Sequence, residues 1–359
     1  MIDRAPTFTP GFRLLVEACR EAFAPGATAR LEPWLEAGAK EALPLARRHR
    51  VQGLAWRGLE PLADRLPEAV RAGLSHDSRD IARTGLQSLL ACRQLLDAHA
   101  RAAIPLLFLK GLPVGMLAYG APFVKMSSDI DMLVLPGHVE ASADILEAQG
   151  FALVLPRHRR RLRSWHGWHK ESVWERGDGL VVELHDAAVS HPRLLAGLDA
   201  NAPSQPVEVA PGIVLPTFAD DILFAYLCVH GASSAWFRLK WICDLAALLR
   251  ERSAAEVLEL HRRALALGAG RCSGMGLLVA VALFDPPWRA AVEALDDPVE
   301  HRLARLSLRE LAASKAPLDR PFGSVALRLS QLALVPKPGA GAAEARRQAI
   351  EVVRMRLGR

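Results

Sequence analysis

Ser127-Ser128-Asp129-Ile130-Asp131-Met132-Leu133-Val134-Leu135 is the stretch that indicates both the fold and the chemistry of this chain. Alternate residues of a β-strand point to the same face, so Asp129 and Asp131 are predicted to share one face while Ile130 points into the core. Two carboxylates about 4 Å apart repel by about 4 kcal/mol at an effective dielectric of about 20, and a cation between them removes that cost. Mg²⁺ suits the position because it binds carboxylate oxygens and shares them with substrate phosphates. A solvated Asp-x-Asp pair at the start of a strand is the alternative interpretation.

The composition is typical of a globular protein. The 359 residues are 51% hydrophobic and 23% charged, and the abundance of Ala, Leu and Arg predicts a mostly helical chain. The net charge of +6 is mild for this length and does not by itself indicate a nucleic-acid partner. The longest apolar run, Gly276 to Phe284, is too short to span a bilayer, and no signal-peptide pattern is visible. The five cysteines form no C-x-x-C pair, so we expect reduced thiols and a cytoplasmic protein.

The order of the predicted elements divides the chain into four parts. These are an N-terminal helical region (1–100), an α/β core (101–216), a C-terminal helical domain (217–334), and a linker with a basic C-terminal helix (335–359). The core is predicted to contain strands and helices over residues 106–109, 112–119, 130–135, 139–149, 151–155, 171–174 and 180–184. Arg176-Gly177-Asp178-Gly179 predicts a hairpin turn between the last two strands. The fold class is therefore α+β, a mixed sheet with flanking helices between two helical domains.

Two further features of the core favour phosphate chemistry. Lys110-Gly111 ends the first strand and opens a helix, where backbone N–H groups, a glycine and a lysine suit a phosphate. In Val181-Val182-Glu183-Leu184-His185, a carboxylate lies on a β-branched strand, where burial is costly unless the charge is paired or binds a metal. Asp129, Asp131 and Glu183 are therefore the predicted carboxylate triad, which can hold two metals about 3.5–4 Å apart.

The segment from residue 236 to residue 244 carries candidate substrate contacts. Arg238 and Lys240 can reach phosphates or the acceptor, and Trp236 or Trp241 can stack on a flat ring. The structural alternatives are that the tryptophans belong to the core and that Asp244 forms a salt bridge with one of the two cations.

Three histidines and an arginine-rich run complete the candidates. His185 points with Glu183 by alternation and can hydrogen-bond a ligand or a metal-bound carboxylate. His169 is predicted at the edge of the active site. His230 either contacts the substrate or is a satisfied core histidine. Five arginines in residues 157–163 are interpreted as a substrate-facing flap, with a solvated loop as the alternative.

In this order, the motifs resemble the bacterial family of uncharacterised nucleotidyltransferases of the NTP_transf_5 type, in the polymerase-β-like superfamily. The resemblance covers about residues 80–250 and rests on Lys-Gly, an aromatic Tyr119, Asp-Ile-Asp, Val-Glu-Leu-His and Trp-x-Arg-Leu-x-Trp. It implies a polymerase-β-like nucleotidyltransferase core with Asp129, Asp131 and Glu183 as metal ligands. Lys110-Gly111 stands where the superfamily has a Gly-Ser phosphate-binding turn.

Two departures from the family pattern concern the donor phosphates. Lys110-Gly111 loses the hydroxyl of a Gly-Ser turn and gains a cation. The arginine that commonly precedes the Asp pair is Lys125 here, which supplies charge without a bidentate fork. Together with Ser128, these residues are the expected phosphate contacts.

Motifs and resemblance together predict a nucleotidyltransferase that uses Mg²⁺, or Mn²⁺ in its place. It would move a nucleotidyl group from an NTP to a hydroxyl or phosphate and release pyrophosphate, with Glu183 completing a metal site or acting as base. The expected acceptor is a small molecule or a peptide, with nucleic acid the less favoured partner. One alternative is a tailoring transferase acting on a (phospho)peptide or natural product with a nucleotide-sugar donor. Another is a non-catalytic nucleotide-binding relative. The sequence does not specify the base, the acceptor or the oligomeric state.

Overall fold

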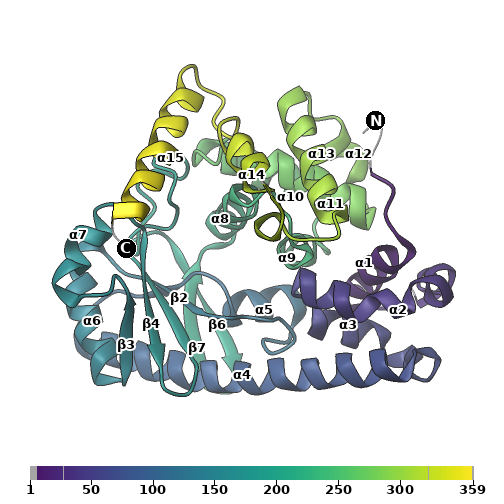
Figure 1. Ribbon diagram of the computed structural model, residues 1–359, viewed down its shortest axis with the longest axis horizontal. Coiled ribbons are helices and arrows are strands. Elements are labelled where there is room, and N and C mark those ends of the chain that lie inside the picture. Colours follow the sequence, from purple (N-terminus) through teal and green to yellow (C-terminus); the bar gives the residue numbers. More distant parts are fainter. Residues whose placement is uncertain (1–5, 27, 322, 358–359) are drawn as a thin grey trace.

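The chain has a mixed α/β fold with helices at both ends of the sequence (Figure 1). This computed structural model describes residues 6–26, 28–321 and 323–357. The helices that precede the sheet are α1 (Pro10–Phe23), α2 (Glu32–His49), α3 (Gln52–Leu59) and α4 (Glu68–Arg101). Short 3₁₀ turns cover Thr28–Arg30, Glu60–Arg65, Pro136–His138, Arg159–Arg161 and Pro317–Asp319. Within the described residues, no helix combines the length and the apolar character needed to cross a bilayer.

A five-stranded mixed sheet forms the centre of the fold. Its members, in spatial order, are β1 (Leu107–Phe108), β2 (Ile130–Leu133), β5 (Val181–His185), β4 (Glu171–Arg176) and β3 (Phe151–Leu155). Strands β2 and β5 are parallel, and the other neighbouring pairs are antiparallel. The connecting helices are α5 (Leu112–Tyr119), α6 (Val139–Ala148) and α7 (Leu162–His166). A separate hairpin is formed by β6 (Ser204–Ala210) and β7 (Ile213–Phe218).

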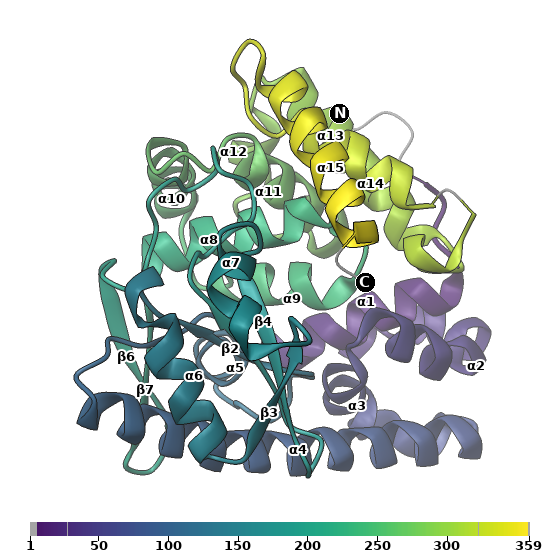
Figure 2. The same cartoon turned by 60° about the vertical axis from the view of Figure 1, so that its left-hand side comes forward.

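The two faces of the sheet differ in polarity because its strands alternate. Ile130, Met132, Val182 and Leu184 point into a hydrophobic core with apolar residues of α4 and α6. The intervening positions of β2, β5 and β4 face the opposite way and include the charged residues described below. Helix α4 runs beneath both the sheet and the N-terminal helices, and it therefore supports the layer that carries the charged face (Figures 1 and 2).

The helices after the sheet share their core with the helices before it. They are α8 (Asp220–Ser233), α9 (Leu239–Leu248), α10 (Ala254–Ala266), α11 (Cys272–Phe284), α12 (Arg289–Glu293), α13 (Pro298–Ala312), α14 (Gly323–Gln331) and α15 (Ala340–Leu357). One continuous apolar cluster contains Leu14 and Leu54 from the N-terminal helices together with Leu245 and Leu278 from the later ones. The division of these helices into separate domains remains a prediction.

Two helical segments differ from the sequence prediction. Helix α14 was not predicted. Its Val325 and Leu329 are exposed, so its apolar residues do not form the single buried stripe from which an amphipathic helix is predicted. The last part of the chain, 335–359, was predicted as a linker followed by a basic helix, and that helix, α15, already begins at Ala340. Figure 2 shows α15 beside α14, on the side of the molecule opposite α4.

Glu300 of α13 is a buried carboxyl group that makes stability depend on pH. It is buried against Gly274, and burial raises its pKa to about 7 from 4.5. The unfolded chain loses this proton near pH 4.5 and the folded chain keeps it up to about pH 7, so the free energy of unfolding falls across that window. We expect Glu300→Gln to raise the free energy of unfolding by about 2 kcal/mol at pH 8, with little change at pH 4.5.

Urea unfolding at both pH values measures this effect. Asp296→Asn, at an exposed carboxyl nearby, is the matched control and should change neither value. A wild type and a Glu300→Gln variant with equal stability at pH 8 would show that the burial cost is absent.

Candidate active site

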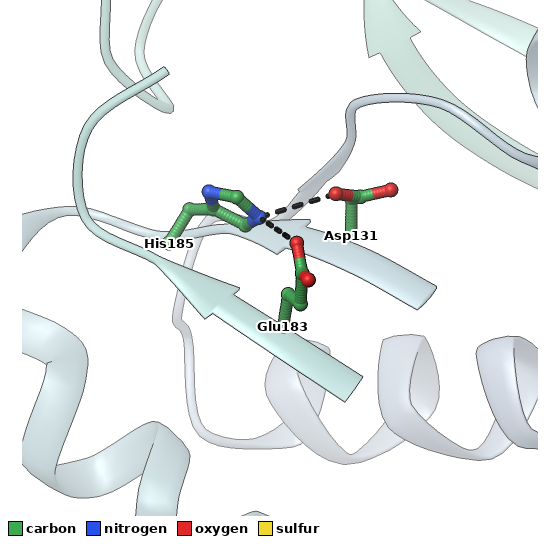
Figure 3. A group of neighbouring side chains, drawn as sticks. All are labelled: Asp131, Glu183 and His185. Carbon is green, nitrogen blue, oxygen red and sulfur yellow. Dashed lines mark hydrogen bonds and ion pairs between the residues drawn. The ribbon is translucent and has the colours of Figure 1, made fainter. Parts of the chain in front are cut away.

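The carboxylates of Asp131 and Glu183 lie side by side on the charged face of the sheet (Figure 3). Their strands, β2 and β5, are parallel neighbours, and the register pairs Asp131 directly with Glu183. The same register pairs Leu133 with His185, so His185 follows Glu183 on that face. Because each of these strands presents its apolar residues to the opposite core, alternation alone brings the three polar side chains together.

His185 bridges the two carboxylates. Its Nε2 lies 3.2 Å from Asp131 Oδ1 and 3.5 Å from Glu183 Oε2 (Figure 3). Its Nδ1 lies 3.2 Å from Lys170 Nζ, which is a donor. The neutral tautomer that fits both sides carries its proton on Nε2 and donates it to Asp131. The ring is fully buried, so these contacts determine its orientation.

Glu171 and Lys170 lie on the other side of the imidazole, next to its Nδ1. Strand β4 pairs Glu171 with His185, and Glu171 Oε2 lies 3.4 Å from His185 Nδ1. Lys170 donates to the Glu171 carboxylate. Burial would raise the pKa of Glu171, but the Lys170 ammonium outweighs it and holds the pKa below its usual value. Because burial raises the pKa of Glu183, and the neighbouring carboxylates add to that effect, the protonated form of Glu183 gains stability.

Lys110 forms a buried ion pair with Asp131. Its Nζ lies 2.8 Å from Asp131 Oδ1. Burial would raise the pKa of Asp131, yet the Lys110 ammonium and the His185 ring hold it well below its usual range. Asp131 raises the pKa of Lys110 in turn, against the effect of burial. Asp131 is therefore an ionised carboxylate at the bottom of the site.

The other oxygen of Asp131 is available to a ligand. Asp131 Oδ2 is buried and has no hydrogen-bond partner among the described residues. Possible ligand atoms of Asp131, Glu183 and His185 all lie within 4.8 Å of one another. A protonated Nε2 cannot bind a metal, so the two carboxylates are the candidate ligands of one ion. Carboxylate oxygens suit Mg²⁺ or Mn²⁺, and a buried carboxylate oxygen without a partner is a position that such an ion would satisfy. These residues therefore fit a divalent cation.

Asp129 lies at the mouth of this group. Strand β2 begins at Ile130, so Asp129 precedes the strand and is not among the three clustered ligands. Its Oδ2 accepts a hydrogen bond from Ser128 Oγ at 3.3 Å, and that hydroxyl accepts one from Arg50 Nη1 at 3.3 Å. The two carboxylates of the Asp-Ile-Asp motif thus occupy different depths of the same cleft.

Lys125 is engaged with Asp244. Its Nζ lies 3.1 Å from Asp244 Oδ2, while the Tyr119 hydroxyl donates to Asp244 Oδ1 at 2.8 Å. All three side chains are buried. The salt bridge that the sequence left as an alternative for Asp244 is therefore present, but with Lys125 as the partner, and it ties the loop before β2 to α9.

Removing the Tyr119 hydroxyl is expected to destabilise the protein. Tyr119→Phe leaves one oxygen of the buried Asp244 carboxylate unsatisfied, which should lower the free energy of unfolding by about 1–3 kcal/mol. Urea unfolding measures the change. The other tyrosine supplies the control, because the Tyr226 hydroxyl makes no hydrogen bond within the described residues, and Tyr226→Phe should cost less. Equal losses in the two variants would contradict the assigned role.

These residues open into a cleft of about 340 Å³ between the sheet and helices α8 and α9. Its lining includes Arg50, Arg238, Lys240, His230 and Trp241, in addition to the carboxylates and their partners. Burial, followed by the nearby Lys110 ammonium, lowers the pKa of His230 well below its usual value, so His230 presents a neutral ring. Trp241 contacts the edge of that ring at a centroid distance of 5.7 Å.

Three predicted site residues lie elsewhere. Trp236 is fully buried in the helical core, so the prediction that it contacts substrate is wrong. His169 stacks on Trp165 and lines a neighbouring cavity of about 680 Å³ between α7 and α15. Gly111 has a φ of +68°, and it lines a small cavity of about 20 Å³ rather than the main cleft.

The arginine-rich run is partly anchored. Arg159 binds carboxylates of α6, including Asp144 at 2.7 Å and Glu147 at 3.4 Å. The neighbouring Arg160 is exposed. One of the five arginines thus holds the segment against α6, and a substrate role for the others remains a prediction.

Sequence reasoning missed Glu171, Lys170 and Arg50. Glu171 could have been found from the hairpin turn at 176–179. Pairing the residues on the two sides of that turn places Glu171 opposite His185. Arg50 has no local signal. It follows α2, and only the tertiary packing brings it to Ser128.

The comparison with known families agrees with this geometry. A family model described as uncharacterised nucleotidyltransferase matches residues 36–285. That range contains the sheet, the clustered polar residues and helices α8 to α11. No curated protein matches the chain.

Proposed function

Because the chain belongs to this family of uncharacterised nucleotidyltransferases, we propose that it transfers a nucleotidyl group from a nucleoside triphosphate to a hydroxyl or phosphate acceptor. One observation carries the proposal. Asp131 and Glu183 are paired across parallel strands, and Asp131 Oδ2 is buried without a partner at the bottom of a cleft rich in cations. Such an arrangement suits a substrate that brings both phosphates and a metal ion.

Asp131 and Glu183 would hold the divalent ion, with Asp129 at the cleft mouth as a further ligand. Bound Mg²⁺ would neutralise triphosphate charge and make the α-phosphorus easier to attack. The acceptor oxygen forms a bond to the α-phosphorus while the bond to the bridging oxygen of the β-phosphate breaks. Pyrophosphate leaves with that electron pair, and the proton of a hydroxyl acceptor passes to a Glu183 oxygen. Lys170 and Glu171 orient His185, which in turn orients Asp131.

Transfer of label from α-³²P-labelled nucleotides tests the proposal. The protein is incubated with Mg²⁺ or Mn²⁺, each NTP, and panels of small hydroxyl compounds, phosphates and peptides, and both labelled acceptor and pyrophosphate are measured. Asp131→Asn should lower the rate of transfer by about 1000-fold. Asp178→Asn, at an exposed carboxyl in the β4–β5 turn, is the matched control and should not affect it. Wild-type protein that binds no nucleotide with either metal would refute the proposal.

The Lys110–Asp131 ion pair favours a second candidate, a nucleotide-binding protein without turnover. The ammonium already neutralises the carboxylate that a metal needs. In that case calorimetry would detect NTP binding while no labelled product or pyrophosphate forms with any acceptor.

A further inference from the structure

The cations that line the cleft fall into two groups. Three of them are already paired with carboxylates, namely Lys110 with Asp131, Lys125 with Asp244 and Lys170 with Glu171. The other three, Arg50, Arg238 and Lys240, have no ion-pair partner within the described part of the chain. We call this second group the cation wall. Its members come from distant parts of the sequence and line the same cleft.

Arg50 reaches the cleft from the end of α2. Its backbone has a φ of +56° and closes the helix in a left-handed conformation, with its N–H bonded to carbonyls of the last turn. Its guanidinium donates to Ser128 Oγ, beside Asp129. This contact needs only one of the guanidinium donors, so others remain for a ligand.

Arg238 is held on aromatic rings at the start of α9. Its guanidinium carbon lies 5.1 Å from the Phe237 ring centroid and 5.8 Å from that of Trp241. Its Nε is buried without a hydrogen-bond partner among the described residues. Burial and the charge of Arg50 lower its pKa to about 10. The two arginines therefore repel each other in the absence of an anion.

Lys240 completes the wall. Burial and then the nearby Lys125 lower its pKa to about 7, with further contributions from Arg50 and Lys110, while Asp129 acts in the opposite direction. Unpaired charges in a partly buried site are unfavourable, and a polyanion that bridges them would remove that cost. The cost of assembling these cations thus indicates the kind of ligand that the site takes.

We propose that Arg50, Arg238 and Lys240 bind the β- and γ-phosphates of the donor, and pyrophosphate after transfer. The inference rests on the proposed function and reassigns the phosphate site that the sequence placed at Lys110-Gly111. Lys110 already forms an ion pair with Asp131. Gly111 does not line the main cleft. The N-terminal helices therefore supply a substrate contact through Arg50.

Calorimetric titration with inorganic tripolyphosphate, in a chelator and without divalent metal, tests the cation wall. Arg50→Gln, Arg238→Gln and Lys240→Met should each weaken binding about tenfold, because each removes a charge-assisted contact. Arg101→Gln is the matched control, since it removes the same charge at the exposed end of α4 and should leave the affinity unchanged. Arg160→Gln tests the exposed arginine-rich run as the alternative polyphosphate site. Thermal unfolding checks that each variant is folded.

Three results would overturn the inference. They are the absence of tripolyphosphate binding by the wild type, unchanged affinity in the three variants, and an equal loss in Arg160→Gln. The last result would assign the polyphosphate to residues 157–163 instead.

Proton uptake gives a readout specific to Lys240. Above pH 7 its amine is neutral in the free protein, and a bound polyphosphate restores the charge, so binding at pH 8 should take up a proton. At pH 6 the amine is already charged and this uptake disappears. Titrations in buffers of different ionisation enthalpy measure the number of protons. At pH 8, Lys240→Met should lower the number of protons taken up on binding. The protons that remain are those taken up or released by the tripolyphosphate itself. Equal numbers in both proteins would contradict the role of Lys240.

The two proposals fail separately. Asp131→Asn should lose transfer yet bind tripolyphosphate at least as tightly as the wild type, because it removes a negative charge and frees Lys110. Transfer by the wild type with unchanged affinity in the wall variants would refute the cation wall alone. Loss of tripolyphosphate affinity in those variants, with no transfer by the wild type, would refute the nucleotidyl transfer alone.

Discussion

Replacing Asp131 with asparagine is expected to lower the rate of nucleotidyl transfer by about 1000-fold, the size of effect that follows loss of one preorganised electrostatic group in an active site. The carboxylate is held by Lys110 and His185, and its free Oδ2 is the buried atom best placed for a metal ion. Asparagine keeps the shape and removes the charge. The rate of label transfer at saturating NTP and Mg²⁺ measures the effect.

The same substitution leaves Lys110 buried without its partner. Breaking a buried ion pair from one side costs about 3–5 kcal/mol, so a loss of activity alone could reflect unfolding. The double variant Lys110→Met/Asp131→Asn removes both charges and should regain much of the stability while remaining inactive. Circular dichroism and urea unfolding follow the fold in both variants. A single variant that keeps more than a tenth of wild-type activity would exclude Asp131 from the reaction.

Replacing Trp236 with alanine is expected to lower the free energy of unfolding by about 3–5 kcal/mol, the usual cost of truncating a buried tryptophan. The ring packs against Gly231 of α8 and Gly276 of α11. A Cβ atom at either position would lie within 2.7 Å of ring carbons. The glycines therefore make room for the indole, and its loss would leave a cavity between two helices.

Trp241→Ala provides the matched comparison, because Trp241 is partly buried and lines the cleft. We expect Trp241→Ala to lower the free energy of unfolding by less than Trp236→Ala does, and to weaken NTP binding. Trp236→Ala should leave the NTP affinity of the folded protein nearly unchanged. Urea unfolding and calorimetry of Mg-NTP binding measure the two quantities. Equal effects of the two substitutions on both would contradict the separation into a core and a cleft tryptophan.

The strands and the position of the acidic pair were predictable because their signals are local. The apolar alternation around Asp131 and Glu183 and the turn at 176–179 predicted β2, β4 and β5 closely. A mixed sheet with flanking helices follows from the same pattern, and the observed fold agrees with it.

Other features depend on contacts that a local pattern does not contain. Whether Trp236 or Trp241 faces the cleft depends on the left-handed backbone at residues 235 and 236, which turns the first indole into the core. The ion pair between Lys110 and Asp131 forms because the end of β1 lies against β2. Arg50 lies 78 residues before its partner Ser128, a separation at which sequence spacing gives no information.

The apolar core shared by the first and last helices also constrains how the chain folds as it is made. Arg20 of α1 donates a hydrogen bond to the carbonyl of Leu283, 263 residues later, and Arg48 of α2 donates to that of Glu310. At a synthesis rate of about 5–20 residues per second, α1 waits about 10–50 s on the ribosome before α11 emerges. During that interval the apolar faces of the N-terminal helices lack their final partners. The N-terminal helices can therefore complete their packing only after α11 has been translated.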